Sequence, residues 1–319
     1  MKILIPDKVN ENATKILEKE GFSVVNKPGI TAEELISVCS DCDAMIVRSG
    51  IKITKIILEA AKKLKLIVRA GVGVDSIDLD SARELGIAVE NTPTANINAA
   101  AEHTITLLLM LSKHIIHSHV ELKGGTWDRK KYKGTELKGK TLGIVGLGNV
   151  GKKVSLVASA LEMDVLGFDP FIDKEAMKEI GATKVELDEL IKNSDYITVH
   201  VPLNDKTRDL ISDKEFSEMK DDVKIINVAR GGVVSEKALE KAIESGKVGA
   251  AALDVYTQEP PICHSLIAHD KVICTPHLGA STVEAQLNVG SDAAEQIIEA
   301  LKNGKLMNVV NKVGKLREC

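Results

Sequence analysis

The stretch Thr141–Gly151 reads TLGIVGLGNVG, an apolar run that ends in three glycines at the spacing Gly-x-Gly-x-x-Gly. A strand, a glycine-rich turn and a new helix in this order are typical of dinucleotide-binding α/β domains. Gly146 allows the tight turn, Gly148 lets the backbone approach a pyrophosphate, and Gly151 lets the helix pack close to the sheet. The helix N-terminus would then face the pyrophosphate with free amides and a positive dipole end. We therefore predict a Rossmann dinucleotide site, with an ordinary strand–helix turn as the alternative.

An acidic residue beyond the glycines indicates which dinucleotide binds. Asp169 ends the run Asp164–Asp169 and lies 18 residues after Gly151. At the carboxyl end of the second strand its carboxylate can accept hydrogen bonds from both adenosine ribose hydroxyls, whereas a 2′-phosphate would meet a like charge. The sequence therefore predicts NAD over NADP. The alternative interpretation of Asp169 is a solvated loop acid before Pro170.

Size and composition limit the class of protein. A chain of 319 residues with 44% hydrophobic content is long enough for two domains. A formal net charge of −4 argues against a nucleic-acid surface, which needs a basic face. The longest apolar stretches are too short for a membrane span, and the N-terminus MKILIPD does not resemble a secretory signal. We expect a cytoplasmic protein that binds neither nucleic acid nor membrane.

The five cysteines show no disulfide framework, but two groups of residues that include them are candidate metal ligands. Cys39 and Cys42 have C-x-x-C spacing, but no second such pair completes a tetrahedral set. The other group consists of neighbouring cysteines and histidines late in the chain: Cys263, His264, His269, Cys274 and His277. We expect no metal at either group.

Strand-like runs alternate with helical patterns from one end of the chain to the other. The expected strands are Lys2–Ile5, Ser23–Val25, Ala44–Val47, Leu66–Val68, Ala88–Glu90, Leu142–Val145, Val165–Phe168, Tyr196–Val199, Ile225–Val228, Ala250–Leu253, Val272–Cys274 and a short tail strand Met307–Val310. Such alternation predicts α/β architecture with parallel sheets and right-handed crossovers. Two doubly wound sheets fit better than one, because the glycine- and lysine-rich segment Lys123–Lys140 separates the two sets of strands.

The expected domains follow from two long helical patterns, Ala99–His114 and Ser281–Asn303, which are also the hinge candidates. We predict a discontinuous substrate-binding domain over residues 1–98 and 287–319, because the tail should return to the first sheet. An NAD-binding domain over residues 99–286 would be inserted in it.

Three polar residues follow apolar strands of the second sheet: Arg230, Glu259 and His277. Strand carboxyl ends are where ligands bind in open α/β sheets. An imidazole suits the loss of a hydroxyl proton when an alcohol is oxidised, a carboxylate on its other nitrogen fixes the tautomer, and a guanidinium can hold a 2-oxo acid. Taken singly, each residue has another interpretation: a surface arginine, a loop acid before Pro260 and a core histidine.

The motifs GLGNVG, NVARGGVV, ALDVYTQEPP and TPHLGAST resemble those of the D-isomer-specific 2-hydroxyacid dehydrogenase family, over nearly the whole chain. The resemblance implies a Rossmann NAD-binding domain inserted in a flavodoxin-like substrate domain. It also implies that Arg230 binds the substrate carboxylate and carbonyl, that His277 is the acid/base and that Glu259 is its partner.

The resemblance implies a larger set of cofactor contacts, in which Asp254 would meet the nicotinamide carboxamide. The cofactor-binding candidates are Val72, Gly146, Gly148, Asn149, Val150, Gly151, Asp169, Val201, Pro202, Thr207, Val228, Ala229, Arg230, Asp254, His277, Gly279 and Ala280. Val72 and Val201 stand where relatives often have threonine, so any contact there must come from backbone.

Within the family, VRSGIKIT, RAGVGVD and WDRKKYKGTELKGKTLGI resemble the branch that oxidises 3-phospho-D-glycerate to 3-phosphohydroxypyruvate, the first step of phosphorylated L-serine biosynthesis. Arg48 and Arg69 follow strands of the first domain, and two guanidiniums suit a phosphate dianion. The substrate-binding candidates are Arg48, Ser49, Arg69, Gly71, Val72, Arg129, Arg230 and His277, with Arg129 supplied by a partner subunit. The sequence after about Val310 is too short for a regulatory amino-acid-binding domain, so a short form is expected.

Other functions of the same scaffold remain open at this point. They are a hydroxypyruvate/glyoxylate reductase, another D-2-hydroxyacid dehydrogenase, and an NAD-sensing corepressor without enzymatic activity. The alternative for Arg48 and Arg69 is a pair of surface arginines. By resemblance we expect a homodimer with the segment Ala99–Lys138 at its interface.

Overall fold

The computed structural model describes residues 1–262 and 264–317. These residues form two compact units: unit 1 comprises Met1–Asn96 and the chain from Thr282 onward, and unit 2 comprises Ile97–Ser281. The unit boundaries coincide with helix starts, because α5 begins at Ile97 and α13 at Val283. The boundary expected after residue 286 falls inside α13.

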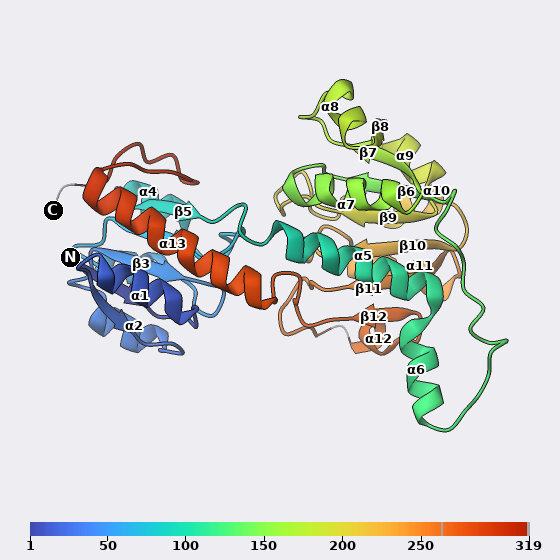
Figure 1. Ribbon diagram of the computed structural model, residues 1–319, viewed down its shortest axis with the longest axis horizontal. Helices are drawn as coiled ribbons and strands as arrows, with labels where there is room; N and C mark the ends of the chain where they lie inside the picture. The colour runs from blue at the N-terminus through green and yellow to red at the C-terminus, as the bar shows by residue number, and fades with distance from the viewer. Residues whose placement is uncertain (263, 318–319) are drawn as a thin grey trace. The chain divides into compact units, whose positions relative to one another are not determined.

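Unit 1 is built on a sheet of five parallel strands in the order β2-β1-β3-β4-β5 (Figure 1). Its elements are β1 (Lys2–Ile5), α1 (Glu11–Lys19), β2 (Ser23–Asn26), α2 (Ala32–Val38), β3 (Ala44–Val47), α3 (Lys55–Ala60), β4 (Leu66–Arg69), α4 (Leu79–Glu84), β5 (Ala88–Asn91) and α13 (Val283–Asn303). This strand order is the flavodoxin-like one. Both faces of the sheet are buried, since Leu4 packs with α2 and α3 whereas its neighbours Ile3 and Ile5 pack with α1 and α13.

The tail segment 307–311 returns to β5 in unit 1, but it does not form the predicted strand. Only Val309 makes a bridge, opposite Glu90, and the Val310 amide donates to the Val89 carbonyl at 2.9 Å. One more backbone bond runs from the Asn91 amide to the Asn308 carbonyl at 3.4 Å. Other backbone groups bond to side chains: the buried Glu90 carboxylate accepts the amides of residues 307 and 308, and the Asn311 side-chain amide accepts from the Val89 amide and donates to the Ile87 carbonyl. The prediction that Met307–Val310 forms a strand is therefore wrong, although the segment does lie beside β5, at the edge of the unit 1 sheet.

Unit 2 holds seven parallel strands in the order β12-β11-β10-β9-β6-β7-β8. Its elements are α5 (Ile97–Lys113), α6 (Ile115–Lys123), β6 (Thr141–Val145), α7 (Asn149–Ala160), β7 (Asp164–Phe168), α8 (Lys174–Glu179), β8 (Ala182–Lys184), α9 (Leu187–Asn193), β9 (Tyr196–Val199), α10 (Asp213–Glu218), β10 (Val223–Asn227), α11 (Glu236–Glu244), β11 (Val248–Leu253), α12 (His264–Ala268) and β12 (Val272–Cys274). The strand order reverses between β6 and β9, which is the point where open α/β sheets bind dinucleotides.

The predicted fold class, two doubly wound parallel sheets, is confirmed. Helices α5 and α7 cover one face of the unit 2 sheet and α9, α10 and α11 the other, so both faces are apolar. Strand β8 was not predicted, because its three residues Ala-Thr-Lys carry no apolar pattern. Among the described residues, no helix combines the length and hydropathy of a membrane span.

Candidate active site

In the glycine turn of unit 2, close packing leaves no room for a side chain at Gly146 or Gly151, whereas the position of Gly148 is open. Gly146 has φ +91°, and a Cβ there would lie 2.8 Å from the His200 carbonyl oxygen. A Cβ on Gly151 would lie 2.1 Å from the Gly146 carbonyl oxygen, because α7 packs directly on the turn. At Gly148, by contrast, a Cβ would meet no atom within 4 Å. The space beside Gly148, at the N-terminus of α7, fits a pyrophosphate held by backbone amides.

Asp169 is fixed beside this turn at the end of β7. One carboxylate oxygen accepts the Leu147 amide at 2.9 Å, and the other accepts the Phe171 amide at 2.9 Å. The two bonds orient the carboxylate on the strand next to the glycine turn, which is the place where an adenosine ribose is recognised in this fold. Together, the open space at Gly148 and the placement of Asp169 fit NAD.

The other cofactor candidates of unit 2 differ in what their side chains offer. Val201 packs against the turn, since a Cβ on Gly146 would lie 2.6 Å from its Cγ1. The Thr207 hydroxyl donates to the Pro202 carbonyl at 2.6 Å and accepts the Asn204 amide at 2.9 Å, so it is bonded within its own loop. Asn149 and Val150 open α7 and present its first amides, as expected for pyrophosphate binding. In unit 1, Val72 is 39% exposed and its carbonyl accepts the Asn91 side chain.

His277 and Glu259 form a hydrogen-bonded pair in unit 2. The distance between His277 Nδ1 and a carboxylate oxygen of Glu259 is 2.8 Å, and the second oxygen accepts the Tyr256 amide at 3.3 Å. Because a carboxylate can only accept, Nδ1 carries a proton, and Nε2 remains the atom that can exchange one. Both side chains are partly exposed, 44% for His277 and 39% for Glu259. The pair therefore presents a general acid/base to a solvent-accessible surface.

Arg230 follows β10 in a turn ordered by the buried Asn227. The Asn227 side chain donates to the Arg230 carbonyl at 2.9 Å and accepts the Ala229 amide at 3.1 Å. The Arg230 guanidinium donates to the Ala229 carbonyl at 2.6 Å. At Gly231 a Cβ would lie 1.9 Å from the Tyr256 backbone, so this turn packs directly on the segment that leads to Glu259. The structure thus brings the turns of Arg230, Glu259 and His277 together within unit 2.

Asp254 holds the loop that carries His277. It is fully buried, and its carboxylate accepts the Thr275 hydroxyl at 2.5 Å and the amides of Leu278 and Gly279 at 2.6 and 2.8 Å. Burial alone would raise the pKa of Asp254, but these bonds and one from His103 outweigh it and hold the pKa below its usual range. Asp254 is expected to contact the nicotinamide carboxamide, but both of its carboxylate oxygens already accept hydrogen bonds from other residues of unit 2.

The remaining candidates of this region lie around the same loop. Gly279 packs against Val228, since a Cβ on Gly279 would lie 2.9 Å from the Val228 Cγ1 atom. Ala280 lies in the turn closed by the bond from the Ser281 amide to the Leu278 carbonyl at 2.8 Å.

Unit 1 places Arg48 and Arg69 at the carboxyl ends of the neighbouring strands β3 and β4, where Val47 pairs with Arg69. The Arg48 amide donates to Asp7 and its guanidinium to the Gln286 side chain, each at 2.5 Å. Burial raises the pKa of Asp7, and the Arg48 amide and charge oppose this shift. Sequence reasoning missed Asp7 and Gln286.

Two smaller substrate candidates accompany these arginines. Ser49 is exposed beside Arg48. Gly71 has φ +142°, a backbone conformation that favours glycine, and a Cβ there would displace the Arg69 guanidinium, whose Nη1 atom would lie 1.4 Å away.

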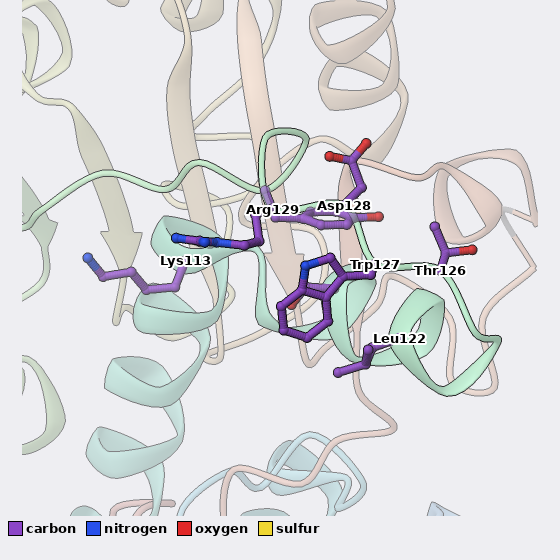
Figure 2. Close-up of a pocket in the computed structure, with 8 residues that line it drawn as sticks. Lys113, Leu122, Thr126, Trp127, Asp128 and Arg129 are labelled. Atoms are coloured by element: carbon purple, nitrogen blue, oxygen red, sulfur yellow. The ribbon is translucent and has the colours of Figure 1, made fainter.

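Arg129 lies in unit 2 on the segment after α6. Together with Lys113, Trp127 and Tyr132 it lines a hollow of about 320 Å³. Figure 2 shows the Arg129 and Lys113 side chains extending in the same direction, with the Trp127 indole next to Arg129. Arg129 thus borders a cationic and aromatic surface of unit 2.

No group of three metal-ligating side chains occurs among residues 1–262 and 264–317. Cys39, Cys42 and Cys274 are free thiols. Cys263 and the His264 side chain lie outside the described part of the chain, so the expectation for that group stays a prediction.

The open glycine turn with Asp169 beside it suits a dinucleotide, and Arg230 and the Glu259–His277 pair follow strands of the same sheet. The family model described as "D-isomer specific 2-hydroxyacid dehydrogenase, NAD binding domain" matches residues 105–279. The chain belongs to this family, and it carries the family's NAD-binding domain. The predicted family and cofactor are confirmed.

Individual relatives extend the similarity over the whole chain. D-3-phosphoglycerate dehydrogenase of Methanocaldococcus jannaschii is 47% identical over 99% of this chain, which spans 62% of that relative's length. The solved NAD-bound 3-phosphoglycerate dehydrogenase of Entamoeba histolytica is 33% identical with a TM-score of 0.82, covering 98% of this chain and 99% of that one. A solved glyoxylate reductase from Paecilomyes thermophila is 30% identical with a TM-score of 0.90, covering 97% and 98%.

Proposed function

We propose that the chain catalyses NAD-dependent oxidation of 3-phospho-D-glycerate to 3-phosphohydroxypyruvate, the first step of phosphorylated L-serine biosynthesis. The observation that carries this proposal is the pair of guanidiniums, Arg48 and Arg69, on neighbouring strands of unit 1. Two such groups suit a phosphate dianion, which neither D-lactate nor glyoxylate possesses. The names of the relatives from Methanocaldococcus jannaschii and Entamoeba histolytica support it.

The proposed chemistry assigns one role to each side chain. His277 Nε2 takes the proton of the substrate C2 hydroxyl, and Glu259 stabilises the resulting imidazolium through Nδ1. Arg230 binds the carboxylate and polarises the developing carbonyl oxygen. NAD, when bound, accepts the C2 hydrogen as hydride. Loss of one proton and one hydride converts the alcohol to the ketone, so atoms and electrons balance.

A substrate panel tests the proposal directly. The purified chain is given NAD with 3-phospho-D-glycerate, D-glycerate or D-lactate, and NADH with glyoxylate or hydroxypyruvate, while NADH absorbance is followed. We expect kcat/KM for the phosphorylated acid to exceed that for D-glycerate by at least about 100-fold, the scale of two charge-assisted contacts. Preference for glyoxylate would favour a reductase, as in the relative from Paecilomyes thermophila, and absence of any turnover would favour the corepressor.

Variants of unit 1 connect the selectivity to the arginines. Arg48→Ala and Arg69→Ala should each lower the preference for 3-phospho-D-glycerate over D-glycerate while leaving activity on D-glycerate nearly unchanged. Arg83→Ala is the matched control, because Arg83 is a half-exposed arginine of the same unit that pairs with Asp80. Equal effects of all three substitutions would contradict the phosphate assignment.

We propose that α6 and the segment after it form a homodimer interface. α6 carries Ile115 and Val120, yet none of its residues is buried, and Trp127 beyond it is 75% exposed. Several exposed apolar side chains on one short segment are typical of an association site, and a second copy of the chain is the partner proposed here. Val120→Glu should convert a dimer to a monomer in analytical ultracentrifugation, whereas Val283→Glu, an exposed valine of α13, should not.

Arg129 lies beside this surface, and in the proposal it adds positive charge to the substrate site of the second copy. Arg129→Ala should therefore raise KM for 3-phospho-D-glycerate without dissociating the dimer.

We propose a cytoplasmic location, because a reducing compartment keeps thiols such as Cys39, Cys42 and Cys274 free. Fractionation of cells that produce the tagged chain tests this location.

A further inference from the structure

A histidine of α5, which the sequence left without a function, contacts the loop that carries the catalytic histidine. His103 Nε2 lies 3.1 Å from the Thr275 hydroxyl and 3.3 Å from the Asp254 carboxylate. The His103 side chain is 18% exposed, and Asp254 is fully buried. Three separate elements of unit 2, namely α5, the end of β11 and the loop after β12, therefore meet at these side chains.

The direction of the hydrogen bonds follows from the ionised carboxylate. The Asp254 carboxylate can only accept hydrogen bonds, so the Thr275 hydroxyl donates its single hydrogen to Asp254. The Thr275 oxygen must then accept from His103, which requires that Nε2 of His103 carries a hydrogen. The Nε2 hydrogen of His103 thus faces both the Thr275 oxygen at 3.1 Å and the Asp254 carboxylate at 3.3 Å, so His103 reaches Asp254 directly and through Thr275.

Asp254, where these hydrogen bonds end, also holds the backbone of the loop that carries His277. The same Asp254 carboxylate accepts the amides of Leu278 and Gly279, and its carbonyl accepts the amide of His277 at 2.9 Å. His277 itself has φ +55°, a left-handed conformation that is unfavourable for a residue other than glycine. Such a conformation persists only where the surrounding bonds impose it.

We propose that His103 is a positioning residue for the proposed reaction, acting through Thr275 and Asp254 to hold His277 in its left-handed conformation. The inference rests on the proposed function only for its catalytic readout. His103 touches neither the Glu259–His277 hydrogen bond nor the glycine turn. Its removal should therefore loosen the placement of His277 and leave the pyrophosphate and ribose contacts intact.

The test compares two substitutions at one position. Gln places its amide nitrogen the same number of bonds from Cβ as Nε2 of histidine, so His103→Gln keeps the donor, whereas His103→Leu removes it. We expect kcat of His103→Leu to fall about tenfold, with the NADH dissociation constant changed less than about twofold, and kcat of His103→Gln to recover most of the loss. Thr106→Val, an exposed position of the same helix, is the control for helix perturbation.

Non-additivity provides a second readout. Thr275→Val removes the path through Thr275 and leaves the direct His103–Asp254 contact of 3.3 Å, so His103→Leu should cost less in the Thr275→Val background than in the wild-type chain. Full additivity would overturn the path through Thr275. A parallel fall of kcat and NADH affinity in both His103 variants would indicate a structural role only and would also overturn the proposal.

Failure of the inference can be told apart from failure of the proposed function. If the wild-type chain turns over a 2-hydroxy acid and His277→Ala does not, unchanged kcat in His103→Leu refutes the inference alone. If the wild-type chain turns over no member of the substrate panel, amide hydrogen exchange at Leu278 and Gly279 replaces the kinetic readout. Faster exchange there in His103→Leu than in His103→Gln supports the positioning role, and equal exchange refutes it.

Discussion

Two glycines of the turn at 146–151 should respond in opposite ways to the same substitution. In Gly151→Ala the new Cβ lies 2.1 Å from the Gly146 carbonyl oxygen, about 1.2 Å short of an ordinary C···O contact of about 3.3 Å. Helix α7 must move away from the turn, and overpacking of this kind costs about 1–3 kcal/mol of stability. In Gly148→Ala the Cβ meets no atom, and the backbone at φ −63° and ψ −161° accepts an alanine.

For NADH affinity we expect the opposite order, with Gly148→Ala more harmful than Gly151→Ala. The Gly148→Ala methyl group fills the space where the pyrophosphate would approach the backbone, and each lost charge-assisted hydrogen bond is worth about 1.5–3 kcal/mol. NADH affinity should therefore fall at least about tenfold, while the free energy of unfolding changes by less than about 1 kcal/mol.

Two measurements test the opposite effects expected for Gly148→Ala and Gly151→Ala. Fluorescence titration gives the NADH dissociation constant, and thermal unfolding gives stability, with a shift of about 2–4 °C per kcal/mol in a domain of this size. Wild-type NADH affinity in Gly148→Ala would refute the pyrophosphate assignment. An unchanged unfolding temperature in Gly151→Ala would refute the close packing of α7 on the turn.

Three further substitutions test single side chains. His277→Ala should lower turnover at least about 100-fold in steady-state assays while NADH still binds. Asp169→Ala should reduce the preference for NAD over NADP, measured as a ratio of kcat/KM values, because the like charge facing a 2′-phosphate is lost. Burial raises the pKa of Glu90 above its ordinary 4.5, so its ionisation opposes folding and stability declines as pH rises through the raised pKa. Glu90→Gln should remove this decline in urea unfolding midpoints compared between pH 4.5 and neutrality.

The sequence predicted what depends on local pattern. Most of the parallel strands bury both faces and therefore appear as continuous apolar runs, and eleven of the twelve strands in the described residues were predicted within one or two residues. The exception is β8, because Ala-Thr-Lys is not an apolar run, whereas the equally short β12 reads Val-Ile-Cys. The glycine turn was predictable for a related reason, because backbone conformation and close packing at Gly146 and Gly151 allow no other residue.

Contacts between distant positions were not predictable in this way. Gln286 meets Arg48 from 238 positions away, and His103 meets Thr275 from 172 positions away. Such partners share no local motif, since the topology of the sheets alone brings them together. The tail failed as a strand for the same reason: Glu90 and Asn311 satisfy backbone groups that a second strand would otherwise have paired.

The interrupted path of unit 1 imposes an order on folding during synthesis. Val289, Ala293 and Ile297 of α13 complete an apolar cluster with β-strand residues such as Ile5 and Ile46. About 200 residues separate the last strand of that sheet from the end of α13, a delay of about 10–40 s at ordinary translation rates. The contiguous unit 2 can reach its native state during that interval, whereas one face of the first sheet has α1 but still lacks α13. The apolar side chains that α13 later covers are therefore exposed on the nascent chain, where a ribosome-associated chaperone would bind them.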